Sequence, residues 1–298
     1  MTNSTASAQP DRQKHRIAGL FGRAAPAHDQ VGPRFFARFA SRLVELTQVR
    51  RGETVLDIAC GRGACLFPVA DDIDPAGRAV GIDLADSMID ELTRDIQARG
   101  LLDVEARVMD AEDLRFPAET FDHILCGFSL FFFPKRERAL EEMKRVLKSG
   151  GRLAISKWGK TDARWRWLED LVESYLPEPD PSPEQAKDTE DLTESPAGMR
   201  TVLRQAGFAH IEVVTEAHQF TYATEEAWWA TQWSHGARHA LERIETRLGP
   251  EGLASFKSDA LPKIQTIKQP GSASVRQVLP VLYTLAVRPQ REAVRPSA

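Results

Sequence analysis

The stretch Glu53-Thr-Val-Leu-Asp-Ile-Ala-Cys-Gly-Arg-Gly-Ala64 decides the fold class of this 298-residue chain. An apolar run ends at Asp57, and a turn that contains Gly61 and Gly63 follows it. Glycine suits a backbone that turns sharply and comes close to a ligand, because it carries no Cβ atom. The stretch therefore predicts a strand that ends in a small-molecule binding loop.

Strand and helix patterns alternate along the chain around this loop. Apolar runs predict strands at 54–58, 79–83, 104–109, 121–126, 152–158, 210–215 and 278–287. Apolar residues at helical spacing predict intervening helices at 65–70, 87–99 and 136–148. Strands that alternate with helices are typical of a parallel sheet covered on both faces. We therefore expect an α/β fold with a doubly wound, mostly parallel, seven-stranded sheet.

The segments outside the alternating core differ from it in composition. Residues 1–14 are polar and charged, which predicts a disordered tail, whereas 15–50 carry apolar residues at helical spacing and predict a helical extension. The main domain is expected over 51–288, followed by a polar tail at 289–298. We expect helical insertions in this domain to form a lid over the binding site. These insertions are expected at 163–206 and 223–276.

Composition and charge weigh against several classes of function. The chain has 39 basic and 43 acidic residues, so it lacks the basic surplus that a nucleic-acid partner requires. Its cysteines, Cys60, Cys65 and Cys126, form no Cys-x-x-Cys pair, which favours reduced thiols and no metal site. No apolar run is long enough to span a bilayer. We expect a cytoplasmic protein that acts on a small molecule. The chain could also form a homo-oligomer.

Four loops are expected to converge on one ligand, because ligands of open α/β sheets lie at the carboxyl ends of the strands. The first loop is the glycine turn after Asp57. Asp83 ends the second strand, where a carboxylate can accept both hydroxyls of a ribose. Asp110-Ala111, after the third strand, suits the rim of an adenine, and Cys126-Gly-Phe128 follows the fourth strand.

A dinucleotide site is the main alternative, since a glycine turn with an acid about twenty residues further on also describes that fingerprint. In this chain, Leu66 stands where a third glycine would let helix and strand approach. Arg62 is the single basic residue beside the turn, so no cluster awaits a pyrophosphate. Asp57 faces the loop, where it could hold a positive group rather than a phosphate. These departures weigh against NAD.

At these residues, over about 55–158, the chain resembles the class I S-adenosylmethionine-dependent methyltransferases. The resemblance implies a Rossmann-like methyltransferase fold that binds S-adenosyl-L-methionine and releases S-adenosyl-L-homocysteine. It implies that the loop 57–63 wraps the methionine and ribose, that Asp83 binds the ribose, and that Asp110 and Ala111 flank the adenine. Gly127 and Phe128 would line the floor near the methyl group. The implied cofactor-binding residues are Asp57, Ile58, Ala59, Gly61, Gly63, Asp83, Leu84, Met88, Asp110, Ala111, Cys126 and Phe128.

Within that family, the chain resembles the ubiquinone and menaquinone biosynthesis methyltransferases and their natural-product relatives. Three passages carry this resemblance, and they lie before the core, after the second strand and in the late insertion. They read Phe21-Gly-Arg-Ala-Ala-Pro-Ala-His-Asp29, Asp83-Leu-Ala-Asp-Ser-Met88 and Trp228-Trp229-x-x-x-Trp233-Ser-His-Gly236. Two departures from the usual pattern are Ala59, where glycine is frequent, and His28, where tyrosine is usual.

Methyl transfer from a sulfonium depends mainly on proximity and alignment, and a base is needed only if the acceptor must lose a proton. His28 and His235 are the candidate catalytic bases, although each could equally be a neutral histidine that only packs or caps. His235 and His239 are four residues apart and could share a helix face as metal ligands. Because no carboxylate accompanies them in that motif, we expect no metal.

Aromatic residues predict the acceptor site, although each of them could instead belong to an ordinary core. They are Phe128, Phe131, Phe132, Phe133, Trp228, Trp229 and Trp233. We expect an enzyme that methylates a small, largely apolar metabolite, such as a quinone, polyketide or terpenoid of secondary metabolism. The alternatives are a nucleic-acid or protein methyltransferase and a non-catalytic domain that binds S-adenosylmethionine.

Overall fold

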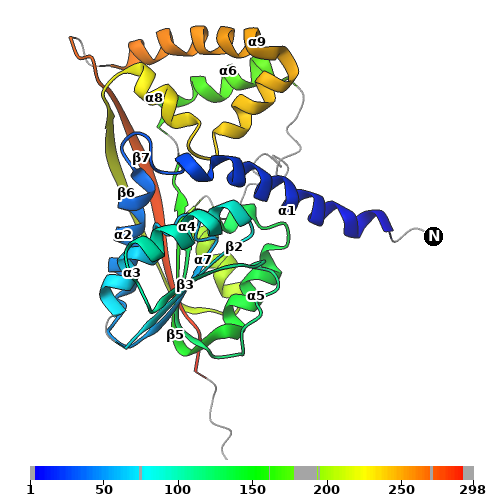
Figure 1. The fold of residues 1–298 in the computed structure, drawn as a ribbon, viewed down its shortest axis with the longest axis vertical. Coiled ribbons are helices and arrows are strands. Elements are labelled where there is room, and N and C mark those ends of the chain that lie inside the picture. The colour runs from blue at the N-terminus through cyan, green and yellow to red at the C-terminus, as the bar shows by residue number, and fades with distance from the viewer. Residues whose placement is uncertain are drawn as a thin grey trace, which may run out of the picture.

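The computed structural model describes residues 4–73, 76–160, 162–177, 193, 195–268 and 271–290. Its centre is one sheet with the strand order β3-β2-β1-β4-β5-β7-β6. The strands are β1 (Thr54–Ile58), β2 (Arg78–Asp83), β3 (Val104–Val108), β4 (Phe121–Gly127), β5 (Leu147–Trp158), β6 (Ala209–Tyr222) and β7 (Val275–Val287). Strands β1 to β5 pair in parallel, and β7 runs antiparallel to β5 and β6. The prediction of a doubly wound, mostly parallel, seven-stranded sheet is confirmed (Figure 1).

Helices cover both faces of the sheet, because successive strand residues point to opposite sides. Val55 of β1 packs with α2 (Phe35–Thr47), α3 (Leu66–Ile73) and α4 (Asp86–Ala98) on one face. Leu56, the next residue, packs with α5 (Arg136–Val146) and α7 (Pro196–Gln205) on the other. Helix α7 lies in the range 163–206 that was expected to cover the site. It is instead part of the sheet's helical layer, because its buried Met199 and Leu203 complete that second core.

A helical cap stands over the carboxyl ends of the parallel strands (Figure 1). It consists of α6 (Trp167–Tyr175), α8 (Glu225–Gln232) and α9 (Arg238–Ile267), which share an apolar core of their own. Strands β6 and β7 are long and carry the chain from the sheet up to this cap. The cap therefore accounts for parts of both insertions expected from the sequence.

The N-terminal segment passes between the cap and the sheet (Figure 1). The expectation of a disordered tail over 1–14 is wrong for residues 4–14, which form the beginning of α1 (Ser4–Ala24). Composition suggested disorder because it could not reveal that Lys14 forms ion pairs with Asp110 and Glu112 of the sheet domain. Residues 1–3 lie outside the described part. A short helix η1 (Ala25–Ala27) and α2 follow within the segment expected to be helical.

Several element bounds differ from the expected ones. The helical insertion expected at 223–276 is divided into α8 and α9, and α9 is kinked at Gly249, whose φ is 72°. Strand β5 begins at Leu147 rather than at residue 152, and β6 extends to Tyr222 rather than to residue 215. Of the expected C-terminal tail, residues 291–298 lie outside the described part. None of the helices in the described ranges is long and apolar enough to cross a membrane.

Candidate active site

A cavity of about 1630 Å³ opens at the carboxyl ends of β1, β2 and β4. Sheet loops form its floor, α1 and α2 form one wall, and residues of the cap close it from above. Its volume exceeds the roughly 300–1,000 Å³ of a typical single-ligand pocket, so it can hold two small molecules together. The predicted site residues that line it are His28, Asp57, Ala59, Gly61, Gly63, Asp83, Leu84, Met88, Asp110, Ala111, Phe128 and His235.

Two predicted residues, Ile58 and Cys126, do not line this cavity. Both side chains are completely buried in the apolar core between the sheet and helices α5 and α7. The physical reason is the alternation of strand side chains, which turns Asp57 toward the cavity and Ile58 away from it. The side chains of Ile58 and Cys126 are therefore corrected from candidate ligand contacts to core residues.

The glycine turn after β1 has the backbone geometry of a close-approach loop. Gly61 and Gly63 have φ values of 51° and 78°, in the left-handed region that glycine adopts without strain. A Cβ on Gly63 would lie 2.7 Å from Leu92 Cδ1, so the Leu92 side chain of α4 would have to shift to admit one. Ala59 also has a positive φ, of 53°. This conformation explains why glycine is frequent at that position in the enzymes that the chain resembles.

Asp57 is buried beside the turn, and one of its oxygens lacks a partner. Its carboxylate accepts a hydrogen bond from the Leu66 backbone N–H, but Oδ2 has no hydrogen-bond partner among the described residues. Burial raises the pKa of Asp57 well above its usual range, and the negative charge of Asp83 raises it further. A positively charged ligand group at Oδ2 would reverse both penalties, because it favours the ionised carboxylate.

Asp83 links the end of β2 to the glycine turn. Its Oδ2 accepts a hydrogen bond from Gly61 N and its Oδ1 from Ala85 N, both at 2.9 Å. Burial raises the pKa of this carboxyl, while the backbone donors act in the opposite direction. A carboxylate has about four acceptor positions, and the backbone N–H groups of Gly61, Leu84 and Ala85 leave about one of them for a ligand hydroxyl.

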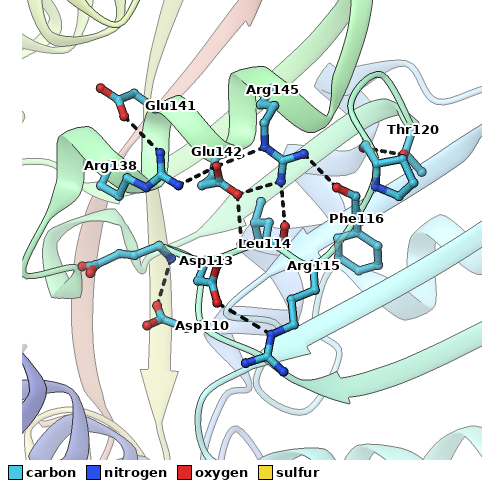
Figure 2. Close-up of polar contacts among 12 residues, drawn as sticks. Asp110, Asp113, Leu114, Arg115, Phe116, Thr120, Arg138, Glu141, Glu142 and Arg145 are labelled. Atoms are coloured by element: carbon cyan, nitrogen blue, oxygen red, sulfur yellow. Dashed lines mark hydrogen bonds and ion pairs between the residues drawn. The ribbon is translucent and has the colours of Figure 1, made fainter.

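The loop that carries Asp110 and Ala111 is fixed from two sides. Figure 2 shows Glu142 and Arg145 of α5 holding its far end: Glu142 accepts from Leu114 N at 3.1 Å, and Arg145 donates to Leu114 O at 2.6 Å. The hydrogen bonds from Arg145 lower the pKa of Glu142. At the near end, Asp110 Oδ2 pairs with Lys14 Nζ at 2.7 Å. Lys14 therefore ties α1 to this rim of the cavity, a contact that no sequence motif indicated.

His28 and His235 both reach the cavity, and their surroundings assign different tautomers. His28 Nδ1 lies 3.1 Å from the Ser234 carbonyl oxygen, which can only accept, so Nε2 carries no proton. His235 Nδ1 accepts from Ala237 N at 3.3 Å, so its proton is on Nε2. Burial lowers the pKa of His28 to about 4 and that of His235 to about 3. Both rings are neutral at pH 7.

Aromatic rings form one wall of the cavity next to these histidines. Phe128 lies against Trp158 with a centroid distance of 4.2 Å, and Phe36 is stacked with His28 at 5.2 Å. Phe131, Phe132 and Phe133 also line the cavity, as predicted from the sequence. The tryptophans expected there, Trp228, Trp229 and Trp233, pack in the cap core instead.

Trp158 and Phe36 are cavity residues that sequence reasoning missed. For Trp158, the signal was available: it occupies the last position of a strand whose carboxyl end borders the site. For Phe36, no local pattern distinguishes it from the buried aromatics of the same helix.

Comparison with known proteins identifies the family. The sequence pattern of a methyltransferase domain matches residues 55–151. Nocamycin O-methyltransferase from Saccharothrix syringae is 30% identical over 244 residues, which cover 76% of this chain and 84% of that protein. The chain belongs to the S-adenosylmethionine-dependent methyltransferases.

Other relatives of this methyltransferase include aklanonic acid methyltransferase DauC from Streptomyces sp. strain C5. It is 38% identical over 148 residues, which cover 50% of this chain and 67% of that protein. A solved structure, the YcgJ protein from Bacillus subtilis, has a TM-score of 0.57 at 19% identity and covers 85% of this chain and 100% of its own. The [4+2]-cyclase SpnF has a TM-score of 0.53 at 22% identity, with coverages of 86% and 82%. Both structures show the same fold.

The residues of this methyltransferase fit its cofactor, S-adenosylmethionine. The turn at Gly61 and Gly63 is open to close approach, and Asp83 has an acceptor position for a ribose hydroxyl. The unpartnered Oδ2 of Asp57 suits a positive charge, which the cofactor carries on its ammonium and sulfonium groups. No group of His, Cys, Asp and Glu side chains in the described ranges is arranged to hold a metal ion.

Proposed function

We propose that this methyltransferase methylates an acidic oxygen of a small, largely apolar, ring-containing metabolite. The observation that carries the proposal is the single cavity shared by the cofactor loops and an aromatic wall. Aromatic side chains offer flat apolar surface to a planar acceptor. The relatives named for nocamycin and aklanonic acid support a small-molecule acceptor, and the O-methyltransferase name supports oxygen.

The cofactor-binding roles follow the order of the strand ends. In this proposal Asp57 holds the positive amino-acid end of the cofactor, Asp83 holds the ribose, and Asp110 with Ala111 borders the adenine. Ala59, Gly61 and Gly63 supply the close backbone surface, while Leu84, Met88 and Phe128 supply apolar contact. When bound, S-adenosylmethionine supplies a methyl group on a sulfonium, which needs no further activation. The protein contributes position, orientation and exclusion of water.

The protonation state of the two histidines indicates that the acceptor oxygen is acidic. His28 Nε2 is unprotonated and faces the cavity, so it is the proposed acceptor of the hydroxyl proton. A base whose pKa is held near 4 favours an acceptor with an acidic hydroxyl, such as an enol or an activated phenol, whereas a carboxylic acid is already ionised at pH 7 and needs no base. His235 Nε2–H is the proposed hydrogen-bond donor to a second oxygen of the acceptor.

Charge and cavity shape weigh against a macromolecular substrate. A net charge of −4 and a cavity closed by a helical cap favour a small molecule over a nucleic acid. Buried free cysteines at 60, 65 and 126 favour a reducing compartment, and we propose the cytoplasm.

Cofactor binding is tested by calorimetric titration with S-adenosylhomocysteine. Wild type should bind in the micromolar range or tighter, and Asp57→Asn should bind at least tenfold more weakly, because the amide places a donor where a cation is expected. Asp83→Ala should also weaken binding by more than tenfold. Asp86→Ala, in the exposed first turn of α4, is the matched control and should bind like wild type. Absence of binding by wild type would refute the proposal.

Acceptor chemistry is tested with methyl-labelled cofactor and a panel of hydroxylated anthraquinones, naphthoquinols and aromatic carboxylic acids. We expect label in a product from at least one member with an acidic hydroxyl or carboxyl group. Alkaline hydrolysis releases labelled methanol from an ester, while carbon-bound label survives both alkali and ether cleavage. Label found only on carbon would contradict the proposed oxygen acceptor and leave the family assignment intact.

A further inference from the structure

Ser156 is a polar residue in the floor of the cavity that the proposed roles do not use. Its side chain is 1% exposed, and Oγ has no hydrogen-bond partner among the residues that the structure describes. The residue nevertheless lines the cavity. A buried hydroxyl without a partner lowers the stability of the folded protein, and almost all such groups in proteins are satisfied. The unpartnered hydroxyl therefore points to a ligand.

The position of Ser156 in the sheet indicates which ligand. It pairs with Gly127 of the neighbouring β4, and its Oγ would lie 3.8 Å from a Cβ built on that glycine. Asp57, on β1, is two strands away on the other side of β4. Parallel partners in register point to the same face, and residues two apart on one strand share that face. Asp57 and Ser156 therefore face the same floor, with Gly127 between them.

The four strand ends form an ordered row beneath the cavity. Asp83 ends β2, Asp57 is on β1, Gly127 ends β4, and Ser156 is on β5. Neighbouring strands are about 4.8 Å apart, so the row from β2 to β5 spans about 14 Å. A ligand whose ribose lies at Asp83 and whose chain extends along this row reaches β4 and β5 with its opposite end. For the cofactor, that end is the amino acid.

We propose that Ser156 is a positioning residue for the amino-acid end of the cofactor, through a hydrogen bond that is direct or bridged by one water. The proposal rests on the cofactor placement given under the proposed function. Asp57 and Ser156 both line the cavity, and Asp57 Oδ2 and Ser156 Oγ are both buried without a partner among the described residues. One supplies negative charge and the other a neutral hydroxyl that donates or accepts. Together they hold the amino-acid end of the cofactor on both sides of Gly127. This contact orients the sulfonium and therefore sets where its methyl group points.

The test is Ser156→Ala, which removes the hydroxyl with little change of shape. The variant should bind S-adenosylhomocysteine about three- to thirtyfold more weakly, the loss expected for one hydrogen bond to a polar or charged group. Its affinity for 5′-methylthioadenosine, which lacks the amino-acid end, should equal that of wild type. Without ligand, its melting temperature should be about 2 °C higher, because an unsatisfied buried hydroxyl has been removed.

Thr284→Val is the matched control, since Thr284 Oγ1 is a second unpartnered, fully buried hydroxyl of the same sheet and does not line the cavity. It should raise the melting temperature and leave both affinities unchanged. Ser156→Ala with unaltered affinity for S-adenosylhomocysteine would overturn the proposal, while binding by wild type would still stand. Equal weakening toward 5′-methylthioadenosine would also overturn it, because the hydroxyl would then act on the adenosine or on the fold.

Discussion

His28 Nδ1 lies 3.1 Å from the backbone carbonyl oxygen of Ser234, and this hydrogen bond joins the N-terminal segment to the cap. The carbonyl fixes the tautomer of His28, and the ring stacks on Phe36 in the wall of the cavity. A residue 206 positions away in sequence thus decides which nitrogen faces the ligand. The tautomer of His28 therefore depends on the docking of the cap against the N-terminal segment.

Acid should destabilise the fold through its two buried histidines. Their ordinary pKa of 6.5 is lowered to about 4 for His28 and about 3 for His235, so the unfolded chain binds protons that the folded protein excludes. The free energy of unfolding should fall as pH drops from about 6.5 toward 4, by up to about 1.4 kcal/mol per pH unit for each histidine. Urea unfolding at several pH values measures this slope.

The matched comparison for this pH dependence is His28→Gln, which keeps a donor for Ser234 and does not titrate. Its slope between pH 6 and 4.5 should be smaller than that of wild type. The comparison is needed because the raised pKa values of Asp57 and Asp83 act with the opposite sign in wild type and variant alike. Equal slopes in the two proteins would show that His28 is not held neutral by burial.

Ala59→Gly should preserve or increase stability. Ala59 has a φ of 53°, where an L-residue with a Cβ is strained by about 1–2 kcal/mol and glycine is not. The gain is reduced by the greater freedom of glycine in the unfolded chain, so we expect a change between zero and about +1 kcal/mol in the free energy of unfolding. Ala64→Gly, five residues further on, has no positive φ to relieve and should lose about 0.5–1 kcal/mol. Chemical denaturation of the two variants measures these changes. A loss of stability at both positions would contradict the conclusion that the backbone of Ala59 is strained.

Lys14→Ala should loosen α1 and speed cofactor release. Lys14 is 15% exposed and pairs with both Asp110 and Glu112, so its removal leaves two carboxylates without their cation and costs about 1–3 kcal/mol of α1 docking. Beyond Lys14, α1 is held by a small apolar cluster and, at its C-terminal end, by the ion pair of Arg23 with Glu242 of α9, so we expect opening to begin at the end that carries Lys14. Hydrogen exchange should show faster exchange in α1, and S-adenosylhomocysteine should dissociate several-fold faster.

Arg12→Ala is the control for Lys14, because Arg12 is exposed on the same helix. Its exchange and its dissociation rate should match wild type. If both variants behave alike, the effect reflects the charge of the N-terminal segment rather than the contact with Asp110.

Gly32→Ala should disrupt the docking of the cap. Gly32 has a φ of 77°, and a Cβ there would lie 2.3 Å from Thr231 Oγ1 of α8. We expect a loss of at least about 2 kcal/mol in the free energy of unfolding, since strain and steric overlap add.

Gly52→Ala measures the strain alone, because its φ is 83° and no atom lies within 4 Å of the added Cβ. Thr231→Ser in the Gly32→Ala background leaves the clash in place, whereas Thr231→Ala should restore part of the loss. Equal losses for the Gly32 and Gly52 variants would refute the clash.

The sheet could be predicted from the sequence because its signals are local. Thr54–Ile58 has the predicted bounds, and the sequence places Asp57, Asp83 and Asp110 at the ends of neighbouring strands, as the structure does. Apolar runs define parallel strands buried on both faces, and the turn after each strand carries its own chemical signature. The orientation of single side chains was less certain, as Ile58 and Cys126 demonstrate.

The tertiary structure decided the features that depend on distant partners. The helix at residues 4–14 could not be read from composition, because Lys14 finds its carboxylates 96 and 98 residues further along the chain. The tautomer of His28, the pairing of Ser156 with Gly127 and the exclusion of Trp228 from the cavity also depend on segments that meet only after folding. The sequence alone therefore determined the sheet and the order of its strand-end loops, since these follow from local patterns, and its resemblance to the methyltransferases indicated the cofactor. The burial and partners of each polar atom, on which the chemistry depends, arise only from long-range packing.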